Sequence, residues 1–170
     1  QEVEELLSSH IQGDYPLVVE TSRHLVEAGG KRFRPLITLI ASHFGNGQSR
    51  EVIEAAVVCE LTHVATLYHD DVMDEAPLRR GVESANNRWG NSVAILTGDY
   101  LFSKASDLLA DLGPEAVRLQ AKTFERLVDP GRRGDHIAYV HLHDLGTANF
   151  ACIRYIHANG YALACAKFSF

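Results

Sequence analysis

The sequence has few of the features that cross-link a small protein or anchor it in a membrane. It contains three cysteines, Cys59, Cys152 and Cys165, an odd number without paired spacing, so we expect no disulfide framework. This usage is typical of a reducing compartment and predicts a cytoplasmic protein. No apolar run approaches the roughly 18 residues that span a bilayer. Three of the first five residues are glutamates, a composition unlike that of a signal peptide.

Positive charge is also scarce, and this narrows the classes of partner. The chain has 16 lysines and arginines against 22 acidic residues, a formal net charge of −6 at pH 7. Such a balance excludes broad affinity for nucleic acid. Its length of 170 residues and its 46% hydrophobic content are those of one globular domain with a substantial core.

Alternating strand patterns are absent up to residue 128, where the period of the apolar residues is helical. We predict helices over 1–12, 17–28, 35–44, 50–73, 91–110 and 115–128, ended by glycine or proline, with Ser49 capping the fourth. Residues 79–90 are predicted to form a loop with a short turn. The predicted fold is an all-α helical bundle.

Composition changes at Asp129, which divides the chain into two predicted parts. All glutamates lie before this residue, and the segment 129–170 is rich in histidine and aromatic residues. We predict a helical domain over 1–128 and a divergent tail over 129–170 that packs on it or extends it. In the tail, His136, His141, His143 and Asp144 could bind a transition metal, but surface histidines are the interpretation we favour.

Three carboxylates are the strongest chemical signal in the sequence. Asp70, Asp71 and Asp74 lie within five residues at the end of a predicted helix. Asp70 and Asp74 are one turn apart, where like charges repel and where a helix end disfavours negative charge. A hard cation removes this conflict, and Mg²⁺ commonly joins one or two carboxylates to substrate phosphates. The alternative is a solvated helix end with ordinary charges.

Basic residues gather in two short motifs that suit an anion. The first is Gly29-Gly30-Lys31-Arg32-Phe33-Arg34-Pro35, in which Lys31 and Arg34 would share a face at the start of the next helix. Cations there oppose the helix dipole, so a diphosphate is the natural ligand; solvent-facing cations with an acidic neighbour are the alternative. The second motif is Arg79-Arg80, and arginine suits phosphate through its planar fork.

Taken in order, these motifs resemble the trans-polyprenyl diphosphate synthases, which condense isopentenyl diphosphate with an allylic diphosphate. The resemblance covers about residues 15–128 and rests on Gly29 to Pro35, on His63 with His69-Asp70-Asp71-Val72-Met73-Asp74, on Arg79-Arg80-Gly81 and on Gly98-Asp99-Tyr100-Leu101. It implies a helical bundle of the isoprenoid synthase type, apparently truncated here. It also implies a Mg²⁺-dependent prenyltransferase. Half a bundle would leave apolar helix faces uncovered, so we expect the chain either to form a homodimer through them or to be poorly stable.

The resemblance also implies roles for individual residues. Asp70 and Asp74 would hold Mg²⁺ on the allylic diphosphate, with Asp71 supporting them and Arg79 contacting that diphosphate. The isopentenyl diphosphate would be held by Lys31, Arg34, His63 and Arg80. Ala65 and Thr66 would set product length, and their small size predicts a product of C20 or longer.

One part of the family pattern is missing, and it leaves two other functions open. No second Asp-rich cluster follows Val128 in this chain. The first alternative is therefore a weakly active or inactive homologue that binds diphosphates or pairs with a complete synthase. The second is a metal-dependent phosphohydrolase that uses His63 with His69 and Asp70, although this leaves the basic motifs unexplained.

Overall fold

The computed structural model describes residues 1–45 and 47–128, and 76% of the described chain is helical. The helices are α1 (Glu2–His10), α2 (Pro16–Glu27), α3 (Phe33–Ser42), α4 (Arg50–Met73), α5 (Ala85–Trp89), α6 (Asn91–Leu112) and α7 (Pro114–Val128). The predicted all-α fold is confirmed. The predicted boundary at Asp129 and the tail histidines lie at or beyond the end of the described residues. None of the helices in the described part is long and apolar enough to cross a membrane.

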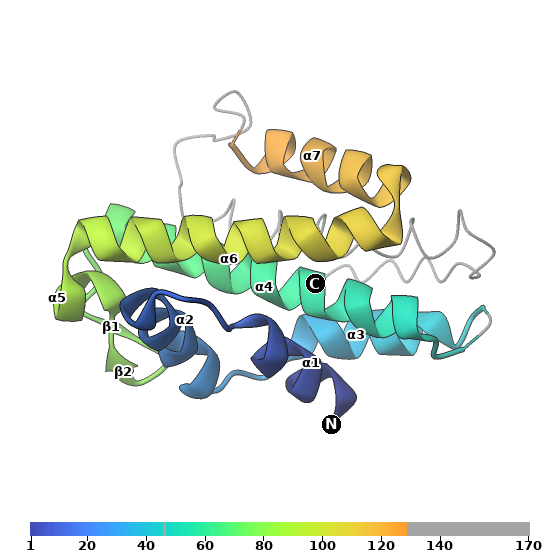
Figure 1. The fold of residues 1–170 in the computed structure, drawn as a ribbon, viewed down its shortest axis with the longest axis horizontal. Helices are drawn as coiled ribbons and strands as arrows, with labels where there is room; N and C mark the ends of the chain where they lie inside the picture. Colours follow the sequence, from blue (N-terminus) through green and yellow to red (C-terminus); the bar gives the residue numbers. More distant parts are fainter. Residues whose placement is uncertain (46, 129–170) are drawn as a thin grey trace, which may run out of the picture.

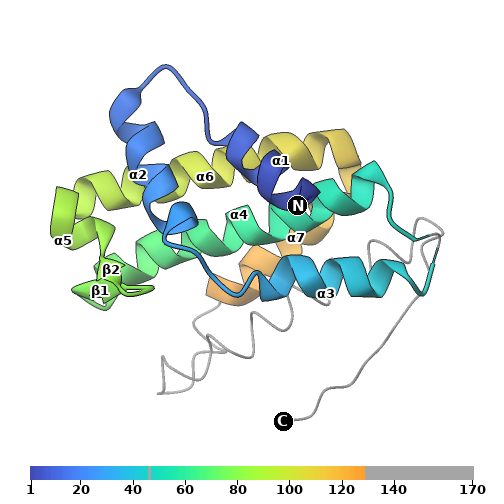
Figure 2. The ribbon, with the colours of Figure 1, turned by 90° about the horizontal axis from the view of Figure 1, so that it is seen from below.

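Helix α4 is the centre of the molecule, and α6 runs antiparallel beside it (Figure 1). Helices α1 and α3 pack on α4, α2 packs on α6, and α7 covers α6 from the side opposite α1 and α2 (Figures 1 and 2). Because neighbours surround α4, buried residues occur all around it rather than along one stripe. The predicted bounds of α4 are confirmed, as is its cap: Ser49 Oγ accepts a hydrogen bond from the Val52 amide.

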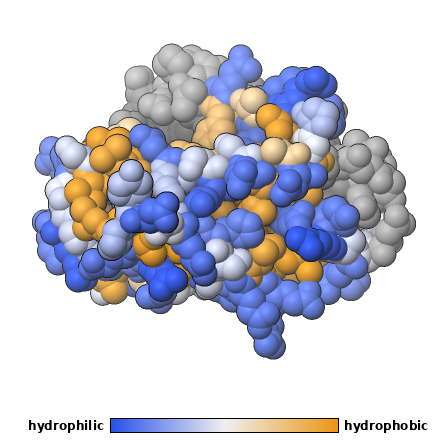
Figure 3. Space-filling view, viewed as in Figure 1, coloured by the Kyte–Doolittle hydropathy of each residue, from blue (hydrophilic) through white to orange (hydrophobic). Residues whose placement is uncertain are grey.

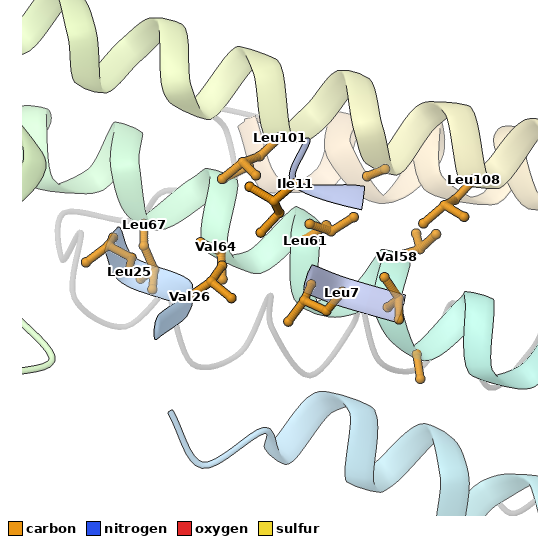
Figure 4. Close-up of a cluster of buried hydrophobic side chains, with 14 of the residues drawn as sticks. Leu7, Ile11, Leu25, Val26, Val58, Leu61, Val64, Leu67, Leu101 and Leu108 are labelled. Atoms are coloured by element: carbon orange, nitrogen blue, oxygen red, sulfur yellow. The ribbon is translucent and has the colours of Figure 1, made fainter. Parts of the chain in front are cut away.

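The apolar core lies between α1, α2, α4 and α6 (Figure 4). Leu7 and Ile11 approach it from the first helix, Leu25 from the second, and Leu61 and Leu101 from the central pair. All five side chains are fully buried. Burial of each such side chain stabilises the fold by about 1.5–3 kcal/mol, so this cluster decides how the helices are placed.

The segment 79–90 was wrongly predicted as a loop with a short turn. It contains an antiparallel hairpin of β1 (Leu78–Arg79) and β2 (Val82–Glu83), followed by α5. Arg80 and Gly81 connect the strands, and both have positive φ, 53° and 82°, as a type I′ hairpin turn requires. Two-residue strands are too short to alternate visibly, and Arg-Gly is not among the dipeptides that commonly mark this turn.

Candidate functional site

The acidic cluster lies where α4 ends, next to the hairpin. Asp70 and Asp71 are buried, with 7% and 0% of their surface exposed, whereas Asp74 caps the helix and is exposed. The Asp74 amide donates to the Asp70 carbonyl at 2.8 Å, so the two residues are one helical turn apart as predicted. Asp70 and Asp74 therefore stand at the same end of α4, one buried and one open to solvent.

Asp71 points to the hairpin instead of joining the other two carboxylates. Arg79, on β1, donates from Nε and Nη2 to Asp71 Oδ1, each at 2.5 Å. Burial raises the pKa of Asp71, and the hydrogen bond and charge of Arg79 oppose that rise. Asp71 Oδ2 is also buried and accepts no hydrogen bond from the described residues.

This geometry suits a cation that takes only part of its ligands from the protein. Across residues 1–45 and 47–128, no three His, Cys, Asp or Glu side chains converge as in a closed metal cage. Mg²⁺ does not need one, because it usually keeps several waters and uses one or two carboxylates together with phosphate oxygens. Asp70 and Asp74 would hold such an ion, and Asp71 would support them while it remains paired with Arg79.

Farther back on α4, a buried glutamate gathers the cations of both basic motifs. Glu60 is 2% exposed, and its Oε1 lies 3.0 Å from Arg32 Nη1 and 3.6 Å from Arg80 Nη2. The motifs also touch directly, because a Cβ on Gly30 would lie 3.1 Å from the Arg80 guanidinium carbon. We call Arg32, Glu60 and Arg80 the buried charge cluster.

The buried charge cluster closes the C-terminal end of α2. Arg80 Nη1 donates to the carbonyls of Leu25 and Gly29, and Arg32 Nη2 donates to that of Val26. Positive charge is favourable at this end of a helix and satisfies carbonyls that have no partner within the helix. In the sequence these cations stand next to the start of the following helix, where they would be unfavourable, and only the fold directs Arg32 and Arg80 to the end of α2.

The other predicted diphosphate ligands lie around this cluster. Arg34, in the first turn of α3, is half-buried, and burial lowers its pKa against the attraction of Glu60. Lys31 is exposed in the preceding loop, and His63 is half-buried on α4, one turn after Glu60. Glu60 and Asp70 are ten residues apart on one helix, about 15 Å along its axis. The carboxylates thus lie at the end of α4, whereas the cations lie around Glu60, near the middle of the same helix.

His69 fastens the acidic end of α4 to α6. Its Nε2 lies 3.2 Å from the Ile95 carbonyl oxygen and 3.3 Å from Asp99 Oδ1, and its ring packs on Phe102. This contact depends on Gly98, because a Cβ there would lie 2.5 Å from His69 Nε2. The glycine of the Gly-Asp-Tyr motif therefore allows the two helices to approach closely.

The two positions predicted to set product length have different surroundings. Ala65 is fully buried in the core, and its carbonyl oxygen would lie 3.1 Å from a Cβ on Gly98. Thr66 is half-buried, and its hydroxyl donates to the His63 carbonyl one turn earlier at 2.7 Å. A larger side chain would therefore be harder to fit at 65 than at 66.

Sequence reasoning missed Glu60 and gave Arg32 no role of its own. Glu60 sits within an apolar stretch of a long helix, where a single acidic residue has no local pattern to distinguish it. One signal was present: a charged residue inside such a stretch is rarely buried unless it is paired. Its partners are 28 and 20 residues away, so only the fold identifies them.

Comparison with known proteins gives a consistent set of relatives. The sequence model of the family described as polyprenyl synthetase matches residues 15–144, which extends past Val128 into the segment predicted not to match. A nonaprenyl diphosphate synthase of Mycobacterium tuberculosis is 52% identical over 127 residues, which are 74% of this chain and 38% of that protein. Heptaprenyl diphosphate synthase component 2 of Geobacillus stearothermophilus is 44% identical over 123 residues, covering 72% of this chain and 38% of that protein.

Solved structures show the same likeness. A polyprenyl synthase from Caulobacter crescentus, complexed with calcium and isoprenyl diphosphate, superposes with a TM-score of 0.78 at 29% identity, covering 90% of this chain and 52% of that one. A geranylgeranyl pyrophosphate synthase from Corynebacterium glutamicum, with the same ligands, gives 0.70 at 43% identity, covering 90% and 51%. The chain thus spans under two fifths of these curated relatives and about half of these solved structures.

Proposed function

Because the chain belongs to the polyprenyl synthetase family, we propose that it contributes to the condensation of isopentenyl diphosphate with an allylic prenyl diphosphate. The predicted family and the isoprenoid synthase type of fold are both confirmed. The observation that carries the proposal is that two groups of charged side chains lie at different levels of α4: the carboxylates at its C-terminal end, and the cations from other elements that gather around Glu60. Glu60 and Asp70 are about 15 Å apart along the helix axis. Two diphosphate substrates require two binding regions. The basic region would bind one diphosphate directly, and the acidic end would bind the other through a metal ion.

The acidic end is proposed to take the allylic substrate. Asp70 and Asp74 would hold Mg²⁺, supported by Asp71, and Arg79 would add its charge from the hairpin. When bound there, the metal would neutralise the diphosphate and so favour its departure. Two solved relatives are complexed with calcium and isoprenyl diphosphate, which supports the use of a divalent ion.

The basic region is proposed to hold isopentenyl diphosphate through Lys31, Arg34, His63 and Arg80. In the reaction the allylic C–O bond breaks, and the diphosphate leaves with the electron pair. The double bond of isopentenyl diphosphate then forms the new C–C bond, and the released diphosphate takes the proton whose loss restores a double bond. The chain's own residues bind and orient the substrates and exclude water, and no protein nucleophile is needed. We expect a product of C20 or longer.

A partner-dependent form of this function is the second candidate. The Geobacillus relative is by name one component of a heptaprenyl diphosphate synthase, and the present chain spans only part of each relative. Under this proposal the chain binds diphosphate but elongates no product alone. The phosphohydrolase alternative has less support, because His69 is directed to α6 and lies about 9 Å along α4 from His63.

The deciding experiment incubates the full chain with Mg²⁺, farnesyl diphosphate and labelled isopentenyl diphosphate, and sizes the extracted lipid. Labelled product that disappears in Asp70→Ala and Asp74→Ala variants is the expected result. A folded chain that binds isopentenyl diphosphate but makes no product would instead favour the partner-dependent form. Release of inorganic phosphate without elongation would favour the phosphohydrolase.

A further inference from the structure

Glu60 is buried, negatively charged and close to a region proposed to bind an anion, a combination that calls for a reason. Its charge weakens the local attraction for a diphosphate, so a helix that only needed to bind anions would be better without it. Glu60 is nevertheless enclosed, with 2% exposure, and both arginines of the buried charge cluster approach the same oxygen, Oε1. The contribution of Glu60 to the site must therefore come from its contacts with Arg32 and Arg80.

The two arginines that it holds both have strained backbones. Arg32 and Arg80 have φ angles of 45° and 53°, in the left-handed region that non-glycine residues rarely adopt. Such conformations cost of order 1–3 kcal/mol and persist only where the surroundings enforce them. Arg32 ends the loop 29–32, and Arg80 lies in the hairpin turn. The backbone conformation of these two residues therefore determines the direction of the chain within both basic motifs.

The contacts on the two arginines differ in kind. Arg32 is bound from three sides: Nη1 to Glu60 at 3.0 Å, Nε to Glu4 at 2.6 Å and Nη2 to the Val26 carbonyl at 2.9 Å. Arg80 reaches Glu60 only at 3.6 Å, too far for a good hydrogen bond. Its attraction to Glu60 therefore depends on the carboxylate's charge, and a neutral side chain of the same shape would lose it.

We propose that Glu60 is a positioning residue, whose buried carboxylate fixes Arg32 and Arg80 and so sets the basic motifs for isopentenyl diphosphate. Arg32 also has a positioning role and is not itself a ligand, because four of its five N–H donors are directed to Glu4, Glu60 and Val26. Lys31, Arg34 and Arg80, whose Nη1 also donates to the carbonyls of Leu25 and Gly29, would then contact the anion. This inference rests on the proposed function for its ligand but on the buried charge cluster alone for its geometry.

The sign of the change in affinity separates positioning from simple charge. If Glu60 acted only through its charge, Glu60→Gln would remove a repulsion and tighten isopentenyl diphosphate binding. If it positions the arginines, the same variant weakens binding by about tenfold or more, since small misplacements of binding groups have effects of this size. Glu54→Gln is the matched control, because Glu54 is also buried on α4 and paired with Arg50 at 2.7 Å, outside the buried charge cluster.

Two measurements on the full chain complete the test. Calorimetric titration with isopentenyl diphosphate gives the affinity, and hydrogen exchange without ligand reports the opening of residues 29–35 and 79–82. We expect Glu60→Gln, but not Glu54→Gln, to weaken binding and to speed exchange in both segments. Tighter or unchanged binding in Glu60→Gln, or unchanged exchange in these segments, overturns the proposal. If the wild-type chain binds no isopentenyl diphosphate, the proposed function is refuted. Faster exchange in Glu60→Gln would in that case still support the positioning role.

Discussion

At the scale of single residues, the site depends on how much space each position allows. Ala65 and Thr66 are adjacent in the sequence and equivalent by motif, yet one is enclosed in the core and the other is half-buried. Gly98 is similar to Ala65 in this respect, because His69 occupies the place of its missing side chain. Substitutions at these positions therefore separate effects on packing from effects on the substrate.

Thr66→Phe is expected to shorten the prenyl product while leaving the fold intact. The half-buried position accepts a larger side chain, which would take up space next to the acidic end of α4. Product length is measured by chromatography of the extracted lipid, with Thr66→Ser as the matched control. Ala65→Phe should instead cost about 1–3 kcal/mol of stability through overpacking. An unchanged product from a folded Thr66→Phe variant would remove this position from length control.

Gly98→Ala is expected to lower the free energy of unfolding by about 1–3 kcal/mol. The added Cβ would lie 2.5 Å from His69 Nε2 and 3.1 Å from the Ala65 carbonyl oxygen, and the latter is backbone that cannot rotate away. Urea unfolding followed by circular dichroism gives the value. Ser103→Ala, at an exposed position of the same helix, is the control. Equal stability of Gly98→Ala and wild type would mean that α4 and α6 accommodate the added methyl group without a loss of stability.

At the scale of elements, the ends of α2 and α4 are held by cations from elsewhere in the chain. Arg32 and Arg80 close the end of α2, and Arg79 closes that of α4 on Asp71. The hairpin is short, and these ion pairs connect it to the helices. Its position relative to α4 should therefore respond to single charge changes.

Arg79→Ala is expected to destabilise the chain by about 2 kcal/mol, because it leaves the Asp71 carboxylate buried without its counter-ion. Asp71→Asn should remove most of that penalty in the double variant, since a neutral amide costs less to bury. A double-mutant cycle of urea unfolding, without metal, measures the coupling. Additive effects would show that the pair contributes no coupling energy.

One face of α3 carries apolar side chains that the described residues leave exposed. Phe33, Leu36 and Ile40 are 58%, 49% and 53% exposed and lie three to four residues apart, on the same side of the helix. Apolar side chains also reach the surface on the face viewed in Figure 3. Exposed apolar patches of this kind favour association.

We expect the purified chain to associate with increasing concentration and Ile40→Lys to reduce this association. The charge would sit in the middle of the α3 face and would have to be desolvated on contact. Sedimentation velocity over a range of concentrations is the measurement. Val117→Lys, at an exposed apolar position on α7, controls for the added charge. A wild-type chain that stays monomeric throughout would contradict the prediction.

At the scale of the whole molecule, α4 contacts helices on several sides, and it supplies Asp70 and Asp74 to the acidic end and Glu60 and His63 to the region where the cations gather. Three of its residues contact the other motifs: Glu60 contacts Arg32, Asp71 contacts Arg79, and His69 contacts Asp99. A ligand that binds at the acidic end of α4 or near Glu60 should therefore increase the stability of the whole bundle. Binding to the native state alone stabilises a protein by RT ln(1 + [L]/Kd).

Mg²⁺ with inorganic diphosphate is expected to raise the unfolding free energy by about 2.7 kcal/mol at a hundredfold excess over Kd. Asp70→Asn combined with Asp74→Asn should abolish the gain. The control is Asp107→Asn with Asp111→Asn, which removes two exposed carboxylates at the same spacing from α6. Thermal unfolding with and without chelator provides the comparison. An equal gain in both double variants would place the metal elsewhere.

Sequence and structure determined different parts of this protein. Apolar spacing, glycines and a serine cap are local signals, so the sequence alone predicted the helices of the described residues except α5, the bounds of α4 and the spacing of one helical turn between Asp70 and Asp74. The contacts of Glu60 with Arg32 and Arg80, the direction of Asp71 toward Arg79 and the closeness of His69 to Gly98 were decided only by tertiary structure. Each joins residues that lie on different elements, and packing of α1, α2, α4 and α6 around one core determines which of them meet. No local pattern encodes such a meeting, because its energy depends on burial and distance rather than on spacing along the chain.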